Sequence, residues 1–307
     1  MHPPLHIPTR PIYREVYPTE PIFFHSRFRF AFFRYLRYRE HAGNHPALTS
    51  GNTMSIETFD IFLAAMAATA LVIFIALYFV DAGYGMLFDR KWGLSVPNKA
   101  GWCIMEAVVF VVMLLLWLGS SRKGEIVPLV FFLFFQLHYF QRAFIYPFLI
   151  KGNSRMPVSI LLMAVVFNVL NGYMQGEWIF YLAPAGLYTP AWLGTPQFIL
   201  GTVLFFTGMF INIRSDQVIR NLRKPGDTNH YLPQKGLYKY VTSANYFGEI
   251  VEWCGFAVLT WSWSGAVFAW WTFANLVPRA NAIYRKYRET FGAQQVGNRK
   301  RIFPFIY

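Results

Sequence analysis

Four polar side chains lie at helical spacing at the end of a strongly apolar stretch. They are Asn212, Asp216, Arg220 and Arg223, separated by four, four and three residues, which places them on one face of a helix. An amide, a carboxylate and two guanidiniums, at the point where a membrane helix meets water, suit a polar ligand with several negative charges. A merely solvated helix end is the alternative interpretation of these four residues alone.

The next segment, residues 214–244, adds groups that favour a dinucleotide. Its arginines and lysines suit phosphates, and Gly226 and Gly236 allow turns that bring the backbone close to a ligand. The chain contains no G-x-G-x-x-G motif after a strand and no P-loop, and the glycine pair at Gly83 and Gly85 lacks the third glycine and the strand. A dinucleotide bound here would therefore lie outside a Rossmann fold, with its nicotinamide end reaching into the membrane.

A second kind of chemistry is predicted inside the apolar stretches. Glu106 lies within residues 102–110 and has no basic neighbour closer than Lys99. Charged groups inside a membrane span are costly, and they face a cavity or a partner. An apolar environment favours the protonated acid, which can donate a hydrogen bond to a ketone oxygen. A structural hydrogen bond to a neighbouring helix is the alternative.

Residues 138–146 hold a second intramembrane cluster. Tyr139, Arg142 and Tyr146 are spaced by three and four residues, so they lie on one helical face. An aromatic stripe alone more often packs in a core. The arginine between the two tyrosines favours a polar site.

Membrane-spanning helices must position these residues. The 307 residues are 55% hydrophobic and 14% charged, with 32 Phe, 18 Tyr and 10 Trp, which is too apolar for an ordinary soluble domain. Because a helix of about 20 apolar residues crosses a bilayer, the sequence predicts an all-α, polytopic membrane protein with seven transmembrane helices and cytoplasmic nucleotide-binding loops. The predicted spans are 58–80, 102–119, 126–150, 157–180, 196–213, 245–261 and 264–280.

The distribution of basic residues predicts the orientation in the membrane. Eighteen Lys and Arg residues belong to the loops after the first, third and fifth spans and to the C-terminal tail, whereas the opposite loops hold only Arg122 and Lys123. The positive-inside rule places the basic side in the cytoplasm. The C-terminus is therefore expected where pyridine nucleotides are available.

The first 53 residues do not fit this pattern, because their seven arginines would lie on the non-cytoplasmic side. We expect residues 1–53 to be a flexible extension, or a stretch ahead of the native start at Met54, and residues 54–307 to form the catalytic domain. A short amphipathic surface helix at residues 28–38, with its arginines at lipid headgroups, is the alternative. The segment lacks the compact apolar core of a signal peptide.

The cysteine and histidine pattern argues against a metal site. Cys103 and Cys254 lie in separate apolar stretches, and five of the seven histidines precede residue 54. The histidines do not form an H-E-x-x-H motif. We expect neither a disulfide framework nor a metalloenzyme.

Residues 83–307 resemble the steroid 5-alpha-reductases. The resemblance rests on an N-x3-D-x6-R-K-P-G run from Asn212, a G-L-[FY]-x-Y-V turn from Gly236, an A-N-[FY]-x-G-E-I-x-E-W helix from Ala244 and an H-Y-x-x-R-x-[FL]-x-Y segment from His138. Several linked motifs at matching spacing make chance agreement improbable.

The resemblance implies that the chain uses NADPH to reduce the Δ4 double bond of a 3-oxo steroid to a 5α product. In that family a glutamate on the second helix and the first tyrosine of the H-Y segment bind the 3-keto oxygen, which maps onto Glu106 and Tyr139. Two hydrogen bonds would stabilise the negative charge that gathers on this oxygen as hydride arrives. The resemblance assigns these residues to the cofactor: Tyr84, Asn171, Asn212, Asp216, Arg223, Asn245, Glu249, Tyr287 and Arg299.

Some positions depart from the family pattern and bear on substrate preference and phosphate contacts. They are Met105, Tyr231, Lys235 and Tyr284. The expected partners are an apolar steroid and membrane lipids, with no nucleic acid and a monomeric chain. Reduction of another lipid enone, an enoyl thioester or a polyprenol is the enzymatic alternative. A non-catalytic lipid-binding protein or transporter is the alternative from another class.

Overall fold

The structure is a computed structural model, and it describes residues 54–227 and 229–307. The predictions for residues 1–53, both the flexible extension and the surface helix at 28–38, lie outside the described residues. Gly51–Tyr307 forms one unit, and the fold described below belongs to that unit.

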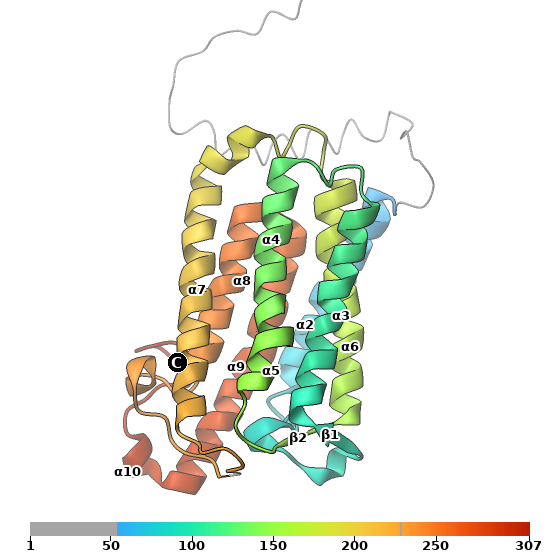
Figure 1. Ribbon diagram of the computed structural model, residues 1–307. Coiled ribbons are helices and arrows are strands. Elements are labelled where there is room, and N and C mark those ends of the chain that lie inside the picture. Colours follow the sequence, from blue (N-terminus) through green and yellow to red (C-terminus); the bar gives the residue numbers. More distant parts are fainter. Residues whose placement is uncertain (1–53, 228) are drawn as a thin grey trace, which may run out of the picture. The chain divides into compact units, whose positions relative to one another are not determined.

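Long helices run side by side through the described part of the chain (Figure 1). They are α2 (Ile56–Ala76), α3 (Asn98–Gly119), α4 (Ile126–Phe140), α6 (Val158–Glu177), α7 (Pro196–Asn221), α8 (Ala244–Thr260) and α9 (Trp263–Phe291). Each predicted span coincides with one of these helices. The prediction of an all-α architecture therefore agrees with the structure, which adds one small strand pair in the part of the chain that it describes.

Five of the described helices are long and apolar enough to cross a membrane, namely Ile56–Ala76, Asn98–Gly119, Ile126–Leu149, Val158–Leu182 and Pro196–Asn221. The expectation of seven spans is not confirmed by this measure. Helix α8 has 17 residues, fewer than the about 20 that a bilayer requires. The second half of α9 carries charged side chains at Arg285, Lys286, Arg288 and Glu289.

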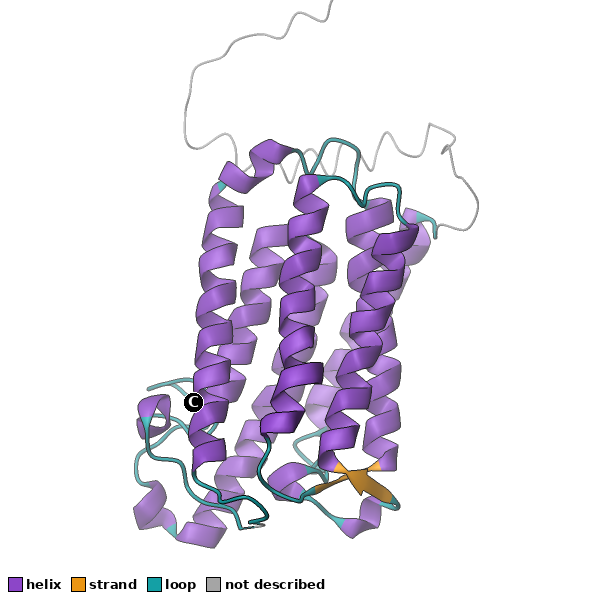
Figure 2. Cartoon of the chain, viewed as in Figure 1, coloured by secondary structure: helices purple, strands orange, loops and turns teal. Residues whose placement is uncertain are grey.

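Short elements connect the long helices. These are the 3-10 turns Gly85–Leu87, Arg90–Trp92, Pro190–Gly194 and Gly236–Lys239, the π-helical turns Gln141–Ile145 and Trp178–Leu182, and the short helices α5 (Tyr146–Leu149) and α10 (Ala293–Val296). Strands β1 (Ser95–Pro97) and β2 (Arg155–Pro157) pair antiparallel, as Figure 2 shows. This pair joins the segment after α2 to the segment after α5.

The π-helical turn Gln141–Ile145 interrupts the helix that carries the predicted intramembrane cluster. Pro147 follows it, and a proline nitrogen cannot donate the hydrogen bond that continues an α-helix. The wider turn alters the α-helical phase on which the predicted face depended. Arg142 and Tyr146 still meet, because the Arg142 guanidinium lies 4.6 Å from the centre of the Tyr146 ring.

Helices α7 and α8 pack with their backbones in close contact at glycines. A Cβ atom on Gly208 would lie 2.2 Å from the backbone nitrogen of Glu252, and a Cβ on Gly248 would lie 2.5 Å from that of Asn212. Small residues of this kind allow helices to approach closely in membranes. The contact brings the polar end of α7 against the first turns of α8.

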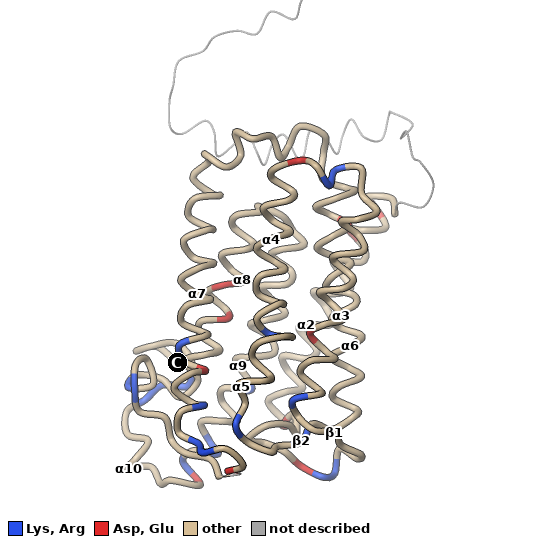
Figure 3. Tube along the Cα trace, viewed as in Figure 1, with Lys and Arg blue, Asp and Glu red and all other residues tan. Residues whose placement is uncertain are grey.

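The loops at one end of the bundle collect most of the charge. The segments after α2, α5 and α7 and the C-terminal tail lie together at this end, where most Lys and Arg residues are found (Figure 3). The tail is joined to the segment before α8 by a parallel bridge between Val241 and Lys300. Arg122 and Lys123 lie in the connection from α3 to α4, at the opposite end. We call the charge-rich end the basic end.

Candidate active site

Tyr139 lies near the end of α4, and only 3% of its surface is exposed. Its hydroxyl oxygen accepts a hydrogen bond of 3.0 Å from Nδ2 of Asn171 on α6. Because this bond uses a lone pair of the oxygen, the tyrosine O–H remains able to donate to another group. The rings of Phe135 and Trp253 pack at 4.7 and 5.7 Å from its ring centre and restrict its movement.

Glu106 lies on α3, which packs against α4 and α6, and it is buried. Its carboxyl group interacts electrostatically with Arg142 and His138, and the hydroxyl of Tyr139 interacts in the same way with Glu106. Among the described residues, no hydrogen bond joins Glu106 to Tyr139. The structure therefore places both predicted catalytic side chains in one buried region and leaves each free to bond a third group.

Contacts between α3 and α6 set the position of Glu106 in this region. Asn168 on α6 donates a hydrogen bond of 2.6 Å to the carbonyl oxygen of Met105. One turn further along α6, a Cβ on Gly172 would lie 3.3 Å from the side chain of Val109. The backbone on either side of Glu106 is thus held against α6, the helix that also carries Asn171. Sequence reasoning did not find Asn168.

Arg142 forms a buried ion pair across the bundle. Its Nη1 atom lies 3.1 Å from Oδ2 of Asp216 on α7. The guanidinium also stacks on the ring of Trp102, 4.5 Å from its centre. Breaking a buried pair leaves an uncompensated charge, which costs about 3–5 kcal/mol. The pair therefore fixes α7 relative to the helix that carries Tyr139.

Asn212, Asp216, Asn245 and Glu249 form one hydrogen-bonded network where α7 meets α8. Nδ2 of Asn245 donates to Oδ1 of Asp216 at 3.1 Å. Nδ2 of Asn212 donates to the carbonyl oxygen of Asn245 at 3.0 Å and to Oε2 of Glu249 at 3.3 Å. Four of the predicted cofactor residues are therefore brought together, although residues 212 and 249 belong to different helices.

A cavity of about 170 Å³ opens next to this network at the basic end. It lies among the segment after α2, the segment between α7 and α8, and α9. Five of the nine predicted cofactor residues line it, namely Tyr84, Asp216, Arg223, Asn245 and Tyr287. Arg220, His230 and Arg279 contribute further positive or polar groups. The walls thus combine aromatic rings with cations, as an anionic ligand with planar rings requires.

The other predicted site residues lie away from the walls of this cavity. Asn212 is hydrogen-bonded to Asn245, which lines the cavity, and Glu249 is hydrogen-bonded to Asn212. Glu106, Tyr139 and Asn171 lie in the buried region deeper in the bundle. Arg299 lines a separate pocket.

Comparison with known proteins decides the family. Residues 154–307, half of the chain, match the family described as 3-oxo-5-alpha-steroid 4-dehydrogenase. The chain belongs to this family. It is accordingly an oxidoreductase.

Curated relatives of the 3-oxo-5-alpha-steroid 4-dehydrogenase family match far more than the C-terminal half. Human 3-oxo-5-alpha-steroid 4-dehydrogenase 1 is 39% identical over 251 residues, which cover 80% of this chain and 95% of the relative. The corresponding protein of Bos taurus is 37% identical over 243 residues, covering 78% and 93%. Steroid 5-alpha-reductase DET2 of Gossypium hirsutum is 38% identical over 255 residues, covering 81% and 97%. The resemblance inferred from the motifs is therefore confirmed.

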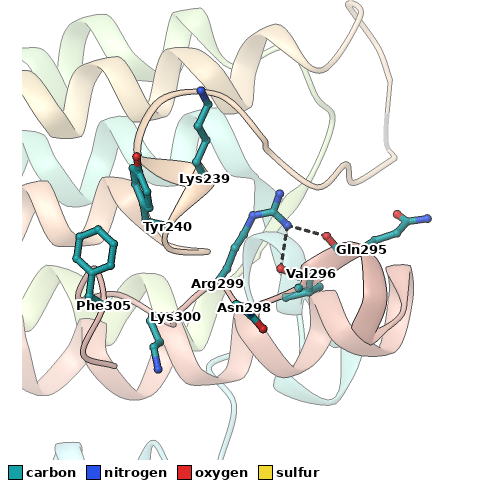
Figure 4. A pocket seen from close by; sticks show the side chains of 9 residues that line it. Lys239, Tyr240, Gln295, Val296, Asn298, Arg299, Lys300 and Phe305 are labelled. Atoms are coloured by element: carbon teal, nitrogen blue, oxygen red, sulfur yellow. Dashed lines mark hydrogen bonds between the residues drawn. The ribbon is translucent and has the colours of Figure 1, made fainter.

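In this family member, and within the described residues, Arg299 reaches the polar network through Tyr238. Its Nε donates to the carbonyl oxygen of Tyr238 at 2.8 Å, and its Nη1 donates to that of Gln295 at 2.7 Å. The hydroxyl of Tyr238 in turn donates to Oδ1 of Asn245 at 3.3 Å. Figure 4 shows Arg299 among the residues of its own pocket, between the turn before α8 and the tail.

Arg279 on α9 is a site residue that sequence reasoning missed. Its guanidinium lies 3.5 Å from the centre of the Tyr84 ring and donates to the carbonyl oxygens of Tyr84 and Ala82 at 2.9 and 3.0 Å. Desolvation raises the pKa of Tyr84 to about 12, and the charge of Arg279 opposes this shift. Tyr84 is therefore a neutral hydroxyl at the cavity wall. In the sequence, Arg279 is recognisable only as one of the basic residues of the C-terminal part.

The buried pair of His138 and Glu252 is a further contact that was not predicted. Nδ1 of His138 lies 2.7 Å from Oε1 of Glu252, and Glu252 is 0% exposed. The Trp253 ring lies 4.6 Å from the imidazole. The pair ties α4 to α8 directly beside Tyr139.

Two of the departures from the family pattern have clear structural partners. The hydroxyl of Tyr231 donates to Oδ2 of Asp227 at 2.9 Å, inside the loop between α7 and α8. The ring of Tyr284 lies under the guanidinium of Arg301, at 4.8 Å. Both changes therefore stabilise loops of the basic end.

Proposed function

We propose that the chain reduces the Δ4 carbon–carbon double bond of 3-oxo-Δ4 steroids to 5α-3-oxo steroids, with NADPH as the hydride donor. One observation carries the proposal: the buried Glu106 interacts electrostatically with Arg142, and the ion pair of Arg142 with Asp216 leads to the cavity at the basic end. The steroid reductases among the relatives supply the reaction class.

The chemistry follows from two hydrogen-bond donors on one carbonyl oxygen. A neutral Glu106 and the O–H of Tyr139 would both donate to the 3-keto oxygen and stabilise the charge that develops there. Each such donor in a dry site contributes about 3 kcal/mol to transition-state stabilisation. Asn171 donates to the Tyr139 oxygen at 3.0 Å, so it would hold the phenol and strengthen its O–H as a donor. The enolate then takes a proton at the α-carbon.

The residues present fit a dinucleotide phosphate. NADPH, when bound, supplies a hydride to the β-carbon of the enone. Arg223, with Arg220 and Arg279, would bind its phosphates, and Tyr84 and Tyr287 would contact its rings. Asn171, Asn212 and Glu249 would orient the amide end deeper in the bundle, where Oδ1 of Asn171 is buried and has no hydrogen-bond partner among the described residues. Arg299 would act by holding Tyr238 against Asn245.

We also propose that all seven helices cross the membrane and that the basic end faces the cytoplasm. The grouping of the loops in Figure 1 supports this, because every second connection lies at the basic end. Residues 54–307 would then be the catalytic domain. Water-soluble cofactor would enter at the basic end, and apolar substrate would enter from the lipid.

A product assay tests the proposed function. Full-length protein purified in detergent is incubated with NADPH and with testosterone or progesterone, and the products are identified by mass spectrometry. We expect NADPH-dependent formation of 5α-dihydro products. An enoyl thioester and a polyprenol serve as comparison substrates. Turnover of either in the absence of any steroid turnover would contradict the steroid assignment.

A further inference from the structure

The C-terminal tail closes into a small loop that displays two apolar side chains. The backbone N–H groups of Ile302 and Phe303 donate to the carbonyl oxygen of Tyr307 at 2.8 and 2.9 Å. The tip of the loop holds Phe305 and Ile306, which are 76% and 80% exposed. Phe305 has a φ of +66°, a conformation that is unfavourable for a bulky side chain. The closed loop holds the Phe305 ring in an exposed position, although an apolar ring in water is more stable when it is buried.

Contacts with the bundle place this loop at the edge of the apolar zone. The hydroxyls of Tyr307 and Tyr78 lie 3.3 Å apart, and Tyr78 follows directly after α2, one of the helices able to cross a membrane. The ring of Phe303 stacks on Phe273 of α9, with centres 5.9 Å apart. The loop that holds Phe305 and Ile306 therefore lies beside the end of a helix that is apolar and long enough to cross a membrane.

A basic pocket of about 460 Å³ adjoins the same loop. Figure 4 shows Lys239 and Lys300 extending on two sides of Arg299, with Tyr240 and Phe305 side by side. The Tyr240 and Phe305 rings are 5.2 Å apart. No carboxylate lines this pocket among the described residues, so its positive charge has no partner of its own. Aromatic side chains beside unpaired lysines are typical of surfaces that bind the lipid interface.

We propose that this pocket binds the headgroup of an anionic phospholipid. Lys239 and Lys300 bind the phosphate and the second acidic group of the headgroup, while Phe305 and Ile306 insert beside the acyl chains of the same lipid. Such a lipid fastens the tail to the membrane. Since Arg299 in this pocket also holds Tyr238, and Tyr238 donates to Asn245, the lipid stabilises the turn that precedes the cofactor network.

Lipid retention measured by native mass spectrometry tests the proposal. The full-length chain is released from nanodiscs that contain phosphatidylcholine with a minor share of phosphatidylserine. We expect the wild type to retain phosphatidylserine selectively, and Lys239→Gln/Lys300→Gln to lose about thirty-fold in affinity, from about 1 kcal/mol for each lysine near an anionic surface. Lys224→Gln/Lys235→Gln removes the same charge from exposed positions of the same end and serves as the matched control. Phe305→Ser/Ile306→Ser keeps the lysines and should weaken retention of the acyl chain.

Four results would overturn the lipid site, three obtained with the variants and one with a soluble anion. One is equal retention of phosphatidylserine by the wild type and Lys239→Gln/Lys300→Gln. Another is an equal loss in Lys224→Gln/Lys235→Gln, which would indicate general surface charge. The third is weaker NADPH binding in Lys239→Gln/Lys300→Gln with lipid retention unchanged, which would assign the pocket to the cofactor. Inorganic phosphate is added to detergent-solubilised protein as a separate probe, and thermal stabilisation equal to that by phosphatidylserine would point to a soluble anion.

Discussion

At the scale of single residues, an acid and a phenol that do not bond each other can both serve the same substrate atom. The hydroxyl oxygen of Tyr139 accepts a hydrogen bond from Asn171. The hydroxyl proton is not used in this bond and can be donated to a substrate. Glu106 is buried, and burial favours a neutral carboxyl group over a charged one. Had the two been hydrogen-bonded to each other, binding of a ketone would first have had to break that bond.

Glu106→Gln is therefore expected to lose turnover without losing nucleotide. The amide keeps the shape of the acid but donates more weakly, and removal of one donor to a developing oxyanion costs about 100- to 1,000-fold in kcat. NADPH binding should stay within about two-fold of wild type, because Glu106 lies away from the cavity walls. The rate is measured under single-turnover conditions, and nucleotide binding is measured by fluorescence titration.

Tyr139→Phe should give a comparable loss, and Tyr188→Phe provides its control. Tyr188 is another buried tyrosine, which accepts a hydrogen bond from Trp178 and donates to the carbonyl oxygen of Thr260. Its replacement should lower thermal stability and leave the rate per folded molecule near wild type. Turnover of Glu106→Gln or Tyr139→Phe at the wild-type rate would refute the roles assigned to these donors.

Arg223→Ala is expected to lose NADPH binding and keep most of its turnover, the reverse of Glu106→Gln. Arg223 lines the cavity at the basic end and donates through Nε to the carbonyl oxygen of Asn229. Loss of the guanidinium removes a charge-assisted contact of about 1.5–3 kcal/mol, which corresponds to about 10- to 150-fold weaker NADPH binding. The rate at saturating NADPH should change far less. Lys224→Ala, an exposed neighbour, is the control, and equal weakening in both variants would argue against a specific phosphate contact.

Residue types and spacing indicated candidate side chains, but not how they pair. The motifs pointed to Glu106 and to the Asn212 and Asp216 face. Glu252, the partner of His138, is 114 residues away in the sequence. Arg279 contacts the Tyr84 ring because α9 packs against the segment after α2. Such pairs depend on how helices are placed in space, and no local pattern encodes that placement.

At the scale of elements, the α7 and α8 pair decides whether the polar network forms. Gly201 and Gly255 meet near the non-basic end, and Gly208 and Gly248 meet near the network. Because their backbones touch, a shift of either helix changes the distance from Asn212 to Asn245 directly. The strength of the network therefore depends on residues that carry no polar group.

Gly208→Ala tests this dependence. The added methyl group would lie 2.2 Å from the backbone nitrogen of Glu252, so the helices must separate. Overpacking of this kind costs about 1–3 kcal/mol and should weaken NADPH binding by displacing Asn212. Gly124→Ala is the control, since its new Cβ meets nothing within 4 Å. The midpoint of thermal unfolding and NADPH affinity are measured for both, and wild-type values for Gly208→Ala would contradict the close packing.

Helix positions were predictable because long apolar stretches have few alternatives in a membrane protein, and each predicted span is a helix. The π-helical turn after α4 could not be predicted, because an apolar stretch that contains Pro147 has the composition of one continuous span. The limits of α7 also differ from the prediction. The helix continues to Asn221, so Asn212, Asp216 and Arg220 share one helix as predicted, whereas Arg223 lies beyond its end and the prediction of a common helical face was wrong for this residue.

At the scale of the whole molecule, the charged part and the apolar part of the candidate site lie in different regions of the bundle. The lined cavity opens among charged loops, whereas Glu106 and Tyr139 lie among apolar helices. The distribution in Figure 3 makes the chain asymmetric along the bundle. A charged cofactor and a water-insoluble substrate would then reach one site from different surroundings.

The proposal of seven crossings rests on how α8 lies against α7. Glycine contacts join the two helices from Gly201 with Leu259 to Gly248 with Asn212, so α8 accompanies α7 along most of its length. At about 1.5 Å per residue, the 17 residues of α8 extend about 26 Å, close to the about 30 Å of a hydrocarbon core. If α7 crosses the membrane as proposed, a helix that accompanies it over this distance is expected to cross as well. The turn between α8 and α9 should therefore reach the side opposite the basic end.

Labelling of introduced cysteines measures this directly. In sealed cells carrying Cys103→Ala/Cys254→Ala protein, a membrane-impermeant maleimide should label Trp263→Cys and Lys123→Cys from outside, and Gln234→Cys only after permeabilisation. All three positions are exposed on the protein surface. Protection of Trp263→Cys together with labelling of Lys123→Cys would mean that α8 and α9 enter the membrane and return, which leaves five spans. Labelling of Gln234→Cys in intact cells would reverse the orientation and place the cofactor cavity away from the cytoplasm, where NADPH could not supply it.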